Sequence, residues 1–386
     1  MSEAQTLALY VHWPFCLAKC PYCDFNSHVR ERVDGGAWKR ALLADLEHEA
    51  GRVRARVGSV FFGGGTPSLM PPALVERLLV RAEQLFGFAD DVEITLEANP
   101  SSVEAGKFAA LAAAGVNRVS LGMQALDDAT LRMLGRLHSA EEALAALDTA
   151  QRHFARQSID LIYARPGQSE ADWAGELGRA LGFGTEHISL YQLTIEPGTR
   201  FATDVRLGTL TPLDDDRAAD LFALTREMTA AAGLPAYEIS NHARPGCESR
   251  HNLAYWRYLD YAGIGPGAHG RRGAVATVRH RKPENYLAAV ERAGHGISEE
   301  RALPVREQAE EALMMGLRLA EGVDLAALAR RFRLPRDDMI DARKLALYAA
   351  QGLVAERGGR LTVTDAGTPL LDALLPELVA LESEAA

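Results

Sequence analysis

The N-terminal two-thirds of the chain alternates short apolar segments with longer amphipathic ones, and this alternation constrains the fold more than any other feature. Strands are expected over 6–13, 59–65, 92–100, 118–125, 158–164, 187–195 and 236–240. Helices are expected between them, over about 36–57, 71–87, 102–116, 139–154, 169–183 and 214–232. Strand–helix–strand units join parallel strands, so we expect a parallel sheet of about six units, curved or closed into an incomplete barrel.

Polar and glycine-rich residues recur where the expected strands end. Residues 63–66 follow the second strand, residues 97–100 follow the third, and Gln124 and Asp160 belong to the next two. Ligands of parallel α/β proteins bind at the C-terminal edge of the sheet. These residues are therefore expected to face one common ligand site.

The pattern changes after about residue 295, where we expect a domain boundary. The larger domain spans 1–295, with 236–295 as an extension, and the smaller one spans 296–386. Helices over 305–319, 324–332 and 337–352, followed by a hairpin that turns at Gly358 and Gly359, indicate a winged-helix-like α+β domain. Residues 301–386 hold 11 Lys and Arg against 14 Asp and Glu, and the chain carries a formal charge of −10, so no nucleic-acid partner is expected.

The sequence shows no export or membrane signal. No basic N-terminal stretch precedes an apolar one, and no apolar run approaches the length of a membrane span. We therefore expect a cytoplasmic protein whose membrane association, if any, is peripheral and through a partner. The sequence leaves open whether the chain forms a homodimer.

Three of the four cysteines fall within "CLAKCPYCDFN", at Cys16, Cys20 and Cys23, whereas Cys247 is isolated in an expected loop. A disulfide scaffold would use more cysteines spread along the chain, so the cluster indicates a metal site in a reducing compartment. One interpretation is a zinc site completed by His12 or His28. The other is a 4Fe–4S cluster held by three thiolates, with one iron open to a small ligand.

A second motif, "FFGGGTPS" over 61–68, favours the iron–sulfur interpretation. Glycines at the end of a strand allow the backbone to approach a ligand closely, and Thr66 adds a hydroxyl group. A tight turn would explain the glycines alone equally well. The combination with C-x3-C-x2-C is the stronger signal.

Together, these two motifs resemble those of the radical S-adenosylmethionine (radical SAM) superfamily, in which SAM occupies the open iron of the cluster. The segments "YVHWPFCLAKCPYCDF", "EANP", "SLGMQ", "IDLIYARPGQ", "HNLAYW" and "YAGIGPGAHG" extend the likeness over most of the chain. They resemble oxygen-independent coproporphyrinogen III oxidases and the related HemW-type heme chaperones. The resemblance implies an incomplete parallel (β/α)6-type barrel followed by a smaller winged-helix-like α+β domain.

The resemblance also implies a role for individual residues. It makes Cys16, Cys20 and Cys23 the ligands of the cluster, and it assigns SAM binding to Tyr10, Gly64, Gly65, Thr66, Glu97, Gln124, Arg136 and Asp160. Carboxylates and amides suit a sulfonium and a ribose diol, and an arginine suits a carboxylate. Without the resemblance, Arg136 would be interpreted as part of a surface ion pair and residues 97–101 as a helix N-cap region.

Two functions compete within this family. One is oxidative decarboxylation of porphyrinogen propionates, and the other is delivery of heme to apo-hemoproteins of the respiratory chain. Phe25 stands where the oxidases carry a fourth cysteine. Cys16 lies near the start of the given sequence, so the N-terminal segment of the oxidases is not expected before it. The segment "HNLAYW" (251–256) matches the motif of the chaperones. We therefore predict a heme chaperone without decarboxylase activity, with coproporphyrinogen III oxidase as the alternative.

His251, in that motif, is the predicted heme ligand. A histidine beside aromatic residues is more often a packed core residue, so the resemblance carries this prediction. His242 and His269 are weaker candidates, and His269 would alternatively lie near the SAM pocket.

Overall fold

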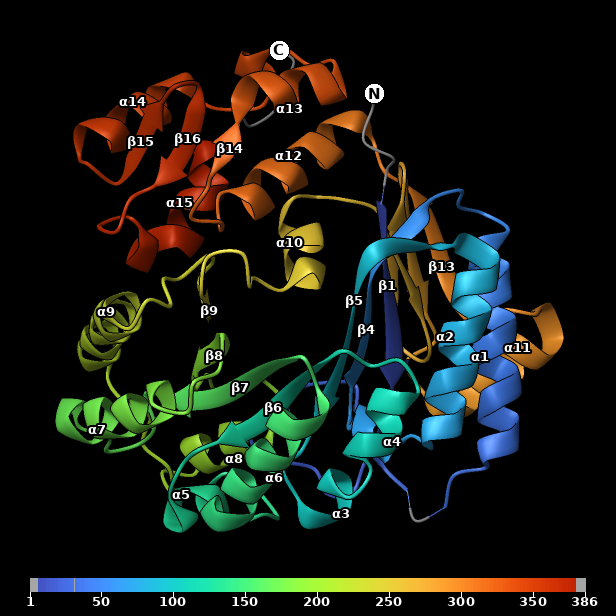
Figure 1. Ribbon diagram of the computed structural model, residues 1–386. Coiled ribbons are helices and arrows are strands. Elements are labelled where there is room, and N and C mark those ends of the chain that lie inside the picture. Colours follow the sequence, from blue (N-terminus) through green and yellow to red (C-terminus); the bar gives the residue numbers. More distant parts are fainter. Residues whose placement is uncertain (1–5, 31, 380–386) are drawn as a thin grey trace.

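The computed structural model describes residues 6–30 and 32–379. Within them, the main sheet has eleven strands in the order β13-β12-β11-β10-β1-β4-β5-β6-β7-β8-β9. Six successive parallel strands form its centre, namely β1 (Thr6–Trp13), β4 (Arg56–Gly64), β5 (Phe88–Ala98), β6 (Arg118–Gln124), β7 (Arg156–Tyr163) and β8 (His187–Gln192). The sheet curves from steep β1 and β4 to tilted β6 and β7, so the predicted incomplete barrel is confirmed (Figure 1).

Helices cover the outer side of this curved sheet (Figure 1). They are α1 (Gly35–Ala50), α2 (Pro72–Phe86), α4 (Phe108–Ala113), α6 (Ala140–His153), α7 (Glu170–Leu181) and α9 (Asp215–Ala231), whereas the short helices α3 (Ser102–Ala105), α5 (Asp128–Met133) and α8 (Arg200–Arg206) follow the C-terminal ends of strands. The helix expected over 102–116 is divided into α3 and α4. On β1, Leu7, Leu9 and Val11 belong to the apolar core, and the alternation of strand residues turns Tyr10 toward the barrel interior.

The prediction of a strand over residues 236–240 is wrong. Ala236 forms only an isolated bridge with His242, and the strand is β9 (Asn241–Ala243), which runs antiparallel to β8. The Glu238 carboxylate accepts the backbone N–H of Ser240 at 3.1 Å, which closes a turn where the sequence suggested an extended segment. A local side-chain bond of this kind competes with sheet formation.

An antiparallel extension continues the sheet beyond β1. β10 (Tyr261–Ile264) pairs with β1 in parallel, and β11 (His269–Arg272), β12 (Val275–Arg279) and β13 (Ile297–Ala302) follow antiparallel, with α11 (Pro283–Ala293) against α1. On β12, Arg279 forms buried ion pairs with Asp45 at 2.8 Å and Glu49 at 2.7 Å, which tie the extension to α1. Since β13 lies beyond residue 295 and still belongs to this sheet, we propose a domain boundary between β13 and the next helix.

The C-terminal unit has its own apolar core. It contains α12 (Val305–Gly316), α13 (Leu325–Phe332), α14 (Ala342–Ala350), α15 (Leu371–Leu378) and a sheet of β14 (Val323–Asp324), β16 (Arg360–Val363) and β15 (Val354–Arg357). The hairpin turns at Gly358 and Gly359, both with positive φ, as predicted. Tyr258, which follows α10 (Arg250–Trp256), packs into this core and joins the two units.

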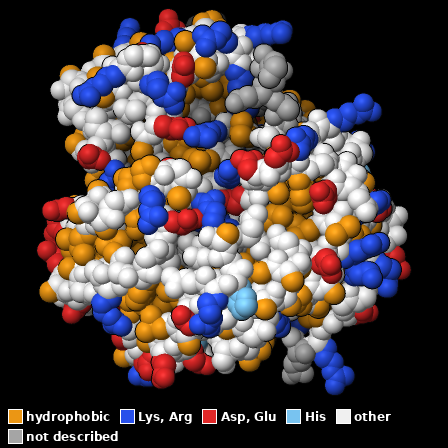
Figure 2. Space-filling model, in the orientation of Figure 1, with side chains coloured by type: hydrophobic (Ala, Val, Ile, Leu, Met, Phe, Trp, Pro, Cys, Tyr) orange, Lys and Arg blue, Asp and Glu red, His pale blue; other side chains and the backbone are white. Residues whose placement is uncertain are grey.

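Acidic and basic side chains are intermixed over both units on the face shown in Figure 2. Among the helices of the described residues, none combines the length and apolar character needed to cross a bilayer.

Candidate cofactor site

A cavity of about 520 Å³ opens at the C-terminal edge of the parallel strands, and we call it the cluster cavity. Most of the predicted site residues line it, from segments spread over the first 160 positions of the chain. They are Cys16, Cys20, Cys23, Gly64, Gly65, Thr66, Glu97, Gln124, Arg136 and Asp160. The expectation that residues at strand ends face one ligand site is therefore confirmed.

The cysteine loop crosses the mouth of this cavity. It leaves β2 (Phe15–Cys16) and returns through β3 (His28–Val29), which pairs with β2 in parallel. The backbone N–H of Cys23 donates to the carbonyl of Cys20 at 3.2 Å, and all three thiols are free and partly exposed. Phe25, next in the loop, also lines the cavity and is 61% exposed.

The glycines after β4 are required by the packing of this loop. A Cβ at Gly65 would lie 2.7 Å from the Phe15 carbonyl oxygen, and one at Gly64, whose φ is +113°, would lie 2.6 Å from the His12 ring. The backbone N–H of Gly65 donates to Trp13 at 2.7 Å, and that of Thr66 donates to Phe15 at 2.8 Å. The motif therefore lets the end of β4 support the cysteine loop directly.

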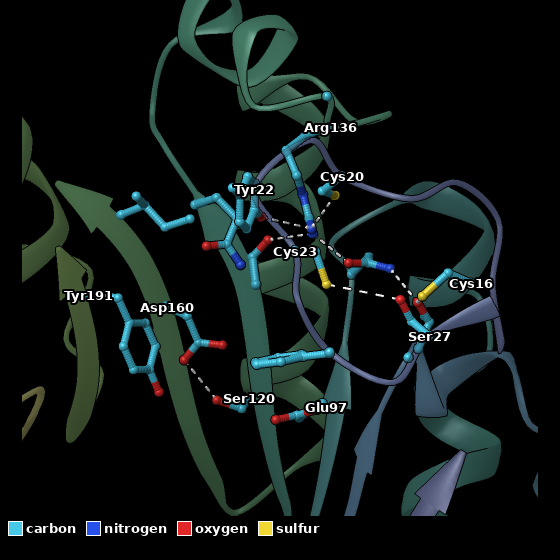
Figure 3. A pocket seen from close by; sticks show the side chains of 18 of the residues that line it. Cys16, Cys20, Tyr22, Cys23, Ser27, Glu97, Ser120, Arg136, Asp160 and Tyr191 are labelled. Carbon is cyan, nitrogen blue, oxygen red and sulfur yellow. Dashed lines mark hydrogen bonds between the residues drawn. The ribbon is translucent and has the colours of Figure 1, made fainter. Parts of the chain in front are cut away.

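Arg136 links the loop to the strand ends. It donates to the Cys20 sulfur at 3.5 Å, to the Gly122 carbonyl at 3.0 Å and to the Asn99 side-chain oxygen (Figure 3). The Asn99 amide donates to Thr66 Oγ1 at 3.2 Å, and Thr66 donates to the Cys16 sulfur at 3.4 Å. Asn99 is not among the predicted site residues, although it belongs to the segment "EANP".

Two carboxylates face the deeper part of the cavity (Figure 3). Burial, reinforced by Asp160, raises the pKa of Glu97 to about 8, and burial raises the pKa of Asp160 to about 6. Glu97 accepts the Gly64 N–H at 3.3 Å, and Asp160 accepts the Ser120 hydroxyl at 3.0 Å. Two neighbouring carboxyl groups with raised pKa values favour a ligand that brings positive charge.

Gln124 ends β6 in a left-handed conformation, with φ of +67°. A Cβ added at Gly122 would lie 2.7 Å from the Gln124 amide nitrogen, so the side chain folds back over that glycine. Tyr22, Ser120 and Tyr191 also line the cavity, and Tyr191 lies beside Asp160 in Figure 3. No motif or spacing pattern in the sequence marks Tyr22, Ser120 or Tyr191 as site residues.

Tyr10 and His251 do not line this cavity. Tyr10 bonds to His12 Nδ1 at 3.0 Å and stacks on Phe61, with 6.3 Å between the ring centroids. His251 is only 3% exposed, stacks on Phe61 at 5.0 Å and meets Tyr255 edge-on at 4.9 Å. Its Nδ1 bonds to Ser59 at 3.1 Å, and burial lowers its pKa to about 3.

The predicted heme-ligand role of His251 therefore lacks support in this conformation. Its Nε2 is buried without a partner, so a heme iron would have to displace the surrounding aromatic rings to reach it. His242 is also buried, and neither of its ring nitrogens has a partner among the described residues. Of the three candidate histidines, only His269 is exposed. It lies on β11 and is not among the residues that line the cluster cavity.

Comparison with known proteins identifies the family. The family model described as the radical SAM superfamily matches residues 10–177, and the model of the HemN C-terminal domain matches residues 303–370. Proteins named heme chaperone HemW are 37% identical in Mycobacterium tuberculosis, over 97% of this chain and 95% of theirs, and 36% identical in Escherichia coli, over 97% and 98%. The chain belongs to the HemW family.

A curated relative and a solved structure are also similar to this chain. The bovine radical S-adenosyl methionine domain-containing protein 1, mitochondrial, is 43% identical over 83% of this chain and 75% of its own length. The structure of coproporphyrinogen III oxidase (HemN) from Escherichia coli superposes with a TM-score of 0.82 over 97% of this chain and 90% of that one. Its sequence identity is 24%, so it supports the fold alone.

Membership of HemW in the radical SAM superfamily implies a 4Fe–4S cluster and SAM, and the cavity fits both. Within residues 6–30 and 32–379, no three His, Cys, Asp or Glu side chains converge on a single metal position. Cys16, Cys20 and Cys23 line the cavity together, and their thiols are free.

Proposed function

We propose that this protein is a heme chaperone, which binds a 4Fe–4S cluster, SAM and heme and delivers heme to apo-hemoproteins of the respiratory chain. The observation that carries the proposal is the likeness, over 97% of the chain, to proteins named heme chaperone. The proposal includes action in the cytoplasm. Contact with a membrane would be peripheral and through a partner, and a homodimer is compatible with it.

In this proposal, Cys16, Cys20 and Cys23 hold the cluster, which supplies an electron to SAM when both are bound. Burial raises the pKa of Cys16 and Cys23, so the thiols give up protons as iron binds. Glu97 and Asp160 offset the positive charge of SAM. Tyr10 acts indirectly in this scheme. Its hydroxyl is hydrogen-bonded to His12, and the His12 ring is hydrogen-bonded at 2.9 Å to the carbonyl of Asn26 in the cysteine loop.

Coproporphyrinogen III oxidation is the second candidate. The lining of the cluster cavity also includes the apolar residues Ile162, Leu193, Phe222 and Ile239, which would suit the apolar part of a porphyrinogen. Against this candidate, Phe25 offers an apolar ring in place of the fourth thiol of the oxidases. An exposed phenyl ring cannot take over the acid–base or redox chemistry of a thiol.

One anaerobic preparation of the reconstituted protein tests both candidates. Half receives coproporphyrinogen III, SAM and a reductant, and the vinyl products are followed by chromatography. The other half receives hemin and then an apo-hemoprotein, and heme transfer is followed by the absorbance of the acceptor. We expect transfer without vinyl product, whereas turnover to protoporphyrinogen IX would replace the chaperone with the oxidase.

A further inference from the structure

Asn99, the residue directly after β5, lies in the lining of the cluster cavity. Its side-chain nitrogen donates to Thr66 Oγ1 at 3.2 Å, and its side-chain oxygen accepts from Arg136. Thr66 donates to the Cys16 sulfur at 3.4 Å. Arg136 donates to the Cys20 sulfur at 3.5 Å (Figure 3). Asn99 therefore joins the donors that approach two of the three clustered thiols.

The position of Asn99 beside a helix start does not explain these contacts. Ser101 is the N-cap of α3, because its hydroxyl accepts the backbone N–H of Glu104 at 3.3 Å. The N-cap interpretation of residues 97–101 is thus correct for Ser101. The Asn99 side chain takes no part in the cap and is directed into the cavity instead.

A buried carboxylate fixes Asn99 in place. Glu104 is 1% exposed and accepts the backbone N–H of Asn99 at 2.9 Å and its side-chain amide at 3.4 Å. The hydroxyl groups of Ser68 and Ser101 donate to the same carboxylate. Hydrogen bonds are strengthened by the low dielectric of a buried site, so these contacts restrict both the backbone and the side chain of Asn99.

The neighbours of Asn99 allow only one orientation of its amide group. A guanidinium group only donates hydrogen bonds, and an ionised carboxylate only accepts them. The Asn99 oxygen therefore faces Arg136, and its NH2 group faces Glu104 and Thr66. A rotation of the amide by half a turn would oppose donors to donors at Arg136 and acceptors to acceptors at Glu104.

This orientation also sets the direction of the Thr66 hydroxyl group. Thr66 is 4% exposed, and its oxygen already accepts a hydrogen from Asn99. A hydroxyl group has a single hydrogen to donate, so that of Thr66 is left for the Cys16 sulfur. Asn99 thereby makes Thr66 a donor to the thiol.

Asn99 acts on Arg136 in a similar way. Nη2 of Arg136 donates to Asn99 and to the Gly122 carbonyl, the latter at 3.0 Å, and this leaves Nη1 for the Cys20 sulfur. The third thiol is outside this network. Cys23 lies 4.0 Å from the Ser27 hydroxyl, a contact in which either group can donate.

We propose that Asn99 is a positioning residue, which directs the Thr66 hydroxyl to Cys16 and the Arg136 guanidinium to Cys20 and so raises the reduction potential of the cluster. Donors to cluster sulfurs stabilise the more negative, reduced state, and this is why they raise the potential. The inference rests on the proposed function, which includes the cluster. It adds a residue that is not one of the cluster ligands and that governs how readily the cluster is reduced.

The test is a redox titration of the full-length protein, reconstituted anaerobically without SAM and followed by electron paramagnetic resonance. Thr66→Val removes the hydroxyl group at nearly constant shape, and Asn99→Ala removes the residue that directs it. Each should shift the reduction equilibrium about tenfold toward the oxidised state, which is about 59 mV for one electron. Thr66→Ser keeps the hydroxyl group and should titrate as wild type does.

A double variant and a matched control separate positioning from general stability. Asn99→Ala combined with Thr66→Val should shift the potential by less than the sum of the single variants, because Asn99 acts partly through Thr66. Asn117→Ala is the control. Asn117 also bridges two backbone groups, at Ile94 and Val92, both at 2.8 Å, but it is not in the lining of the cluster cavity. Its loss should lower the unfolding temperature and leave the potential unchanged.

The outcomes distinguish this inference from the proposed function. If wild type holds the cluster and Asn99→Ala keeps the wild-type potential, Asn99 does not position the donors and the inference is overturned, while the proposed function stands. Additive shifts in the double variant would overturn it as well. If Asn99→Ala holds too little iron to titrate, Asn99→Asp keeps the side-chain volume and should lower the potential, and do so less beside Thr66→Val. If wild type takes up no cluster, the cluster assignment in the proposed function fails, and this inference fails with it.

Discussion

The cluster cavity and a second cavity, which lies between strands β10–β13 and α12 and is called the α12 cavity, draw their residues from the chain in different ways. The cluster cavity collects its lining residues from the cysteine loop and from successive strand ends, so its members recur along the sequence at the spacing of the strands. The α12 cavity joins an antiparallel sheet face to a helix of another unit, and its floor and wall become neighbours only when the two units pack. A site of the first kind can be inferred from spacing, whereas one of the second kind depends on docking.

The electrostatic character of the two cavities also differs. Glu97 and Asp160 give the cluster cavity an acidic interior suited to a cation. The α12 cavity instead has two arginines, Arg271 and Arg301, and two carboxylates, Glu299 and Glu311, so charges of both signs line it.

The largest expected effect breaks the cluster cavity alone. Replacement of Cys16, Cys20 and Cys23 by serine should reduce iron from about four per chain to near zero after anaerobic reconstitution, since serine does not replace a cluster thiolate. Iron and sulfide analysis with absorbance spectroscopy measures this. Cys247→Ser is the control, because this residue lies outside the cavity and should leave iron content unchanged. Full iron content in the triple variant would contradict the assignment.

Next in size is the effect of a methyl group at the end of β4. Gly65→Ala places a Cβ against the Phe15 carbonyl, and the resulting shift of backbone should lower the free energy of unfolding by about 2–3 kcal/mol and reduce cluster occupancy. Chemical denaturation and iron analysis measure the two effects. Gly175→Ala is the control, because nothing lies within 4 Å of its added Cβ on α7. Equal stability of both variants would show that β4 does not support the cysteine loop.

A smaller effect concerns the pH dependence of SAM binding. Glu97, with its pKa of about 8, is protonated at neutral pH, and its ionised form binds a cation better, so SAM affinity should rise between pH 7 and pH 9. The raised pKa also means that the ligand-free protein loses stability as pH rises from about 4.5 through 8. Glu97→Gln should remove both trends and weaken SAM binding about tenfold at pH 9. Anaerobic calorimetry and thermal unfolding measure them, and an unchanged pH profile would exclude Glu97.

The smallest expected effect is the one that sharpens the comparison most. If heme binds outside the cluster cavity, the protein in which all three cluster cysteines are serine should bind hemin within about twofold of wild type. Its Soret spectrum should also match that of wild type. A large loss of hemin affinity would show that heme occupies the cluster cavity instead.

Most of the fold was predictable because its signals are local. The strands of the barrel differ from the predicted segments by a few residues, as the apolar periodicity of each segment requires burial on the sheet. The strand expected over 236–240 failed because Glu238 bonds its own backbone neighbours and forms a turn. Asn99 was not predicted because its contacts to Thr66 and Arg136 join segments that are far apart in the sequence.

The sequence by itself determined the cysteine spacing, the glycines after the second barrel strand and the family, because these depend on residues close together in the chain. Only the tertiary structure decided which histidine is open to a ligand. His251 has the stronger motif, yet Phe61 and Tyr255 close around it from distant segments. His269 belongs to a weaker motif, yet it lies exposed on β11, in the lining of the cavity beside α12. Accessibility is set by long-range packing, which no short motif encodes.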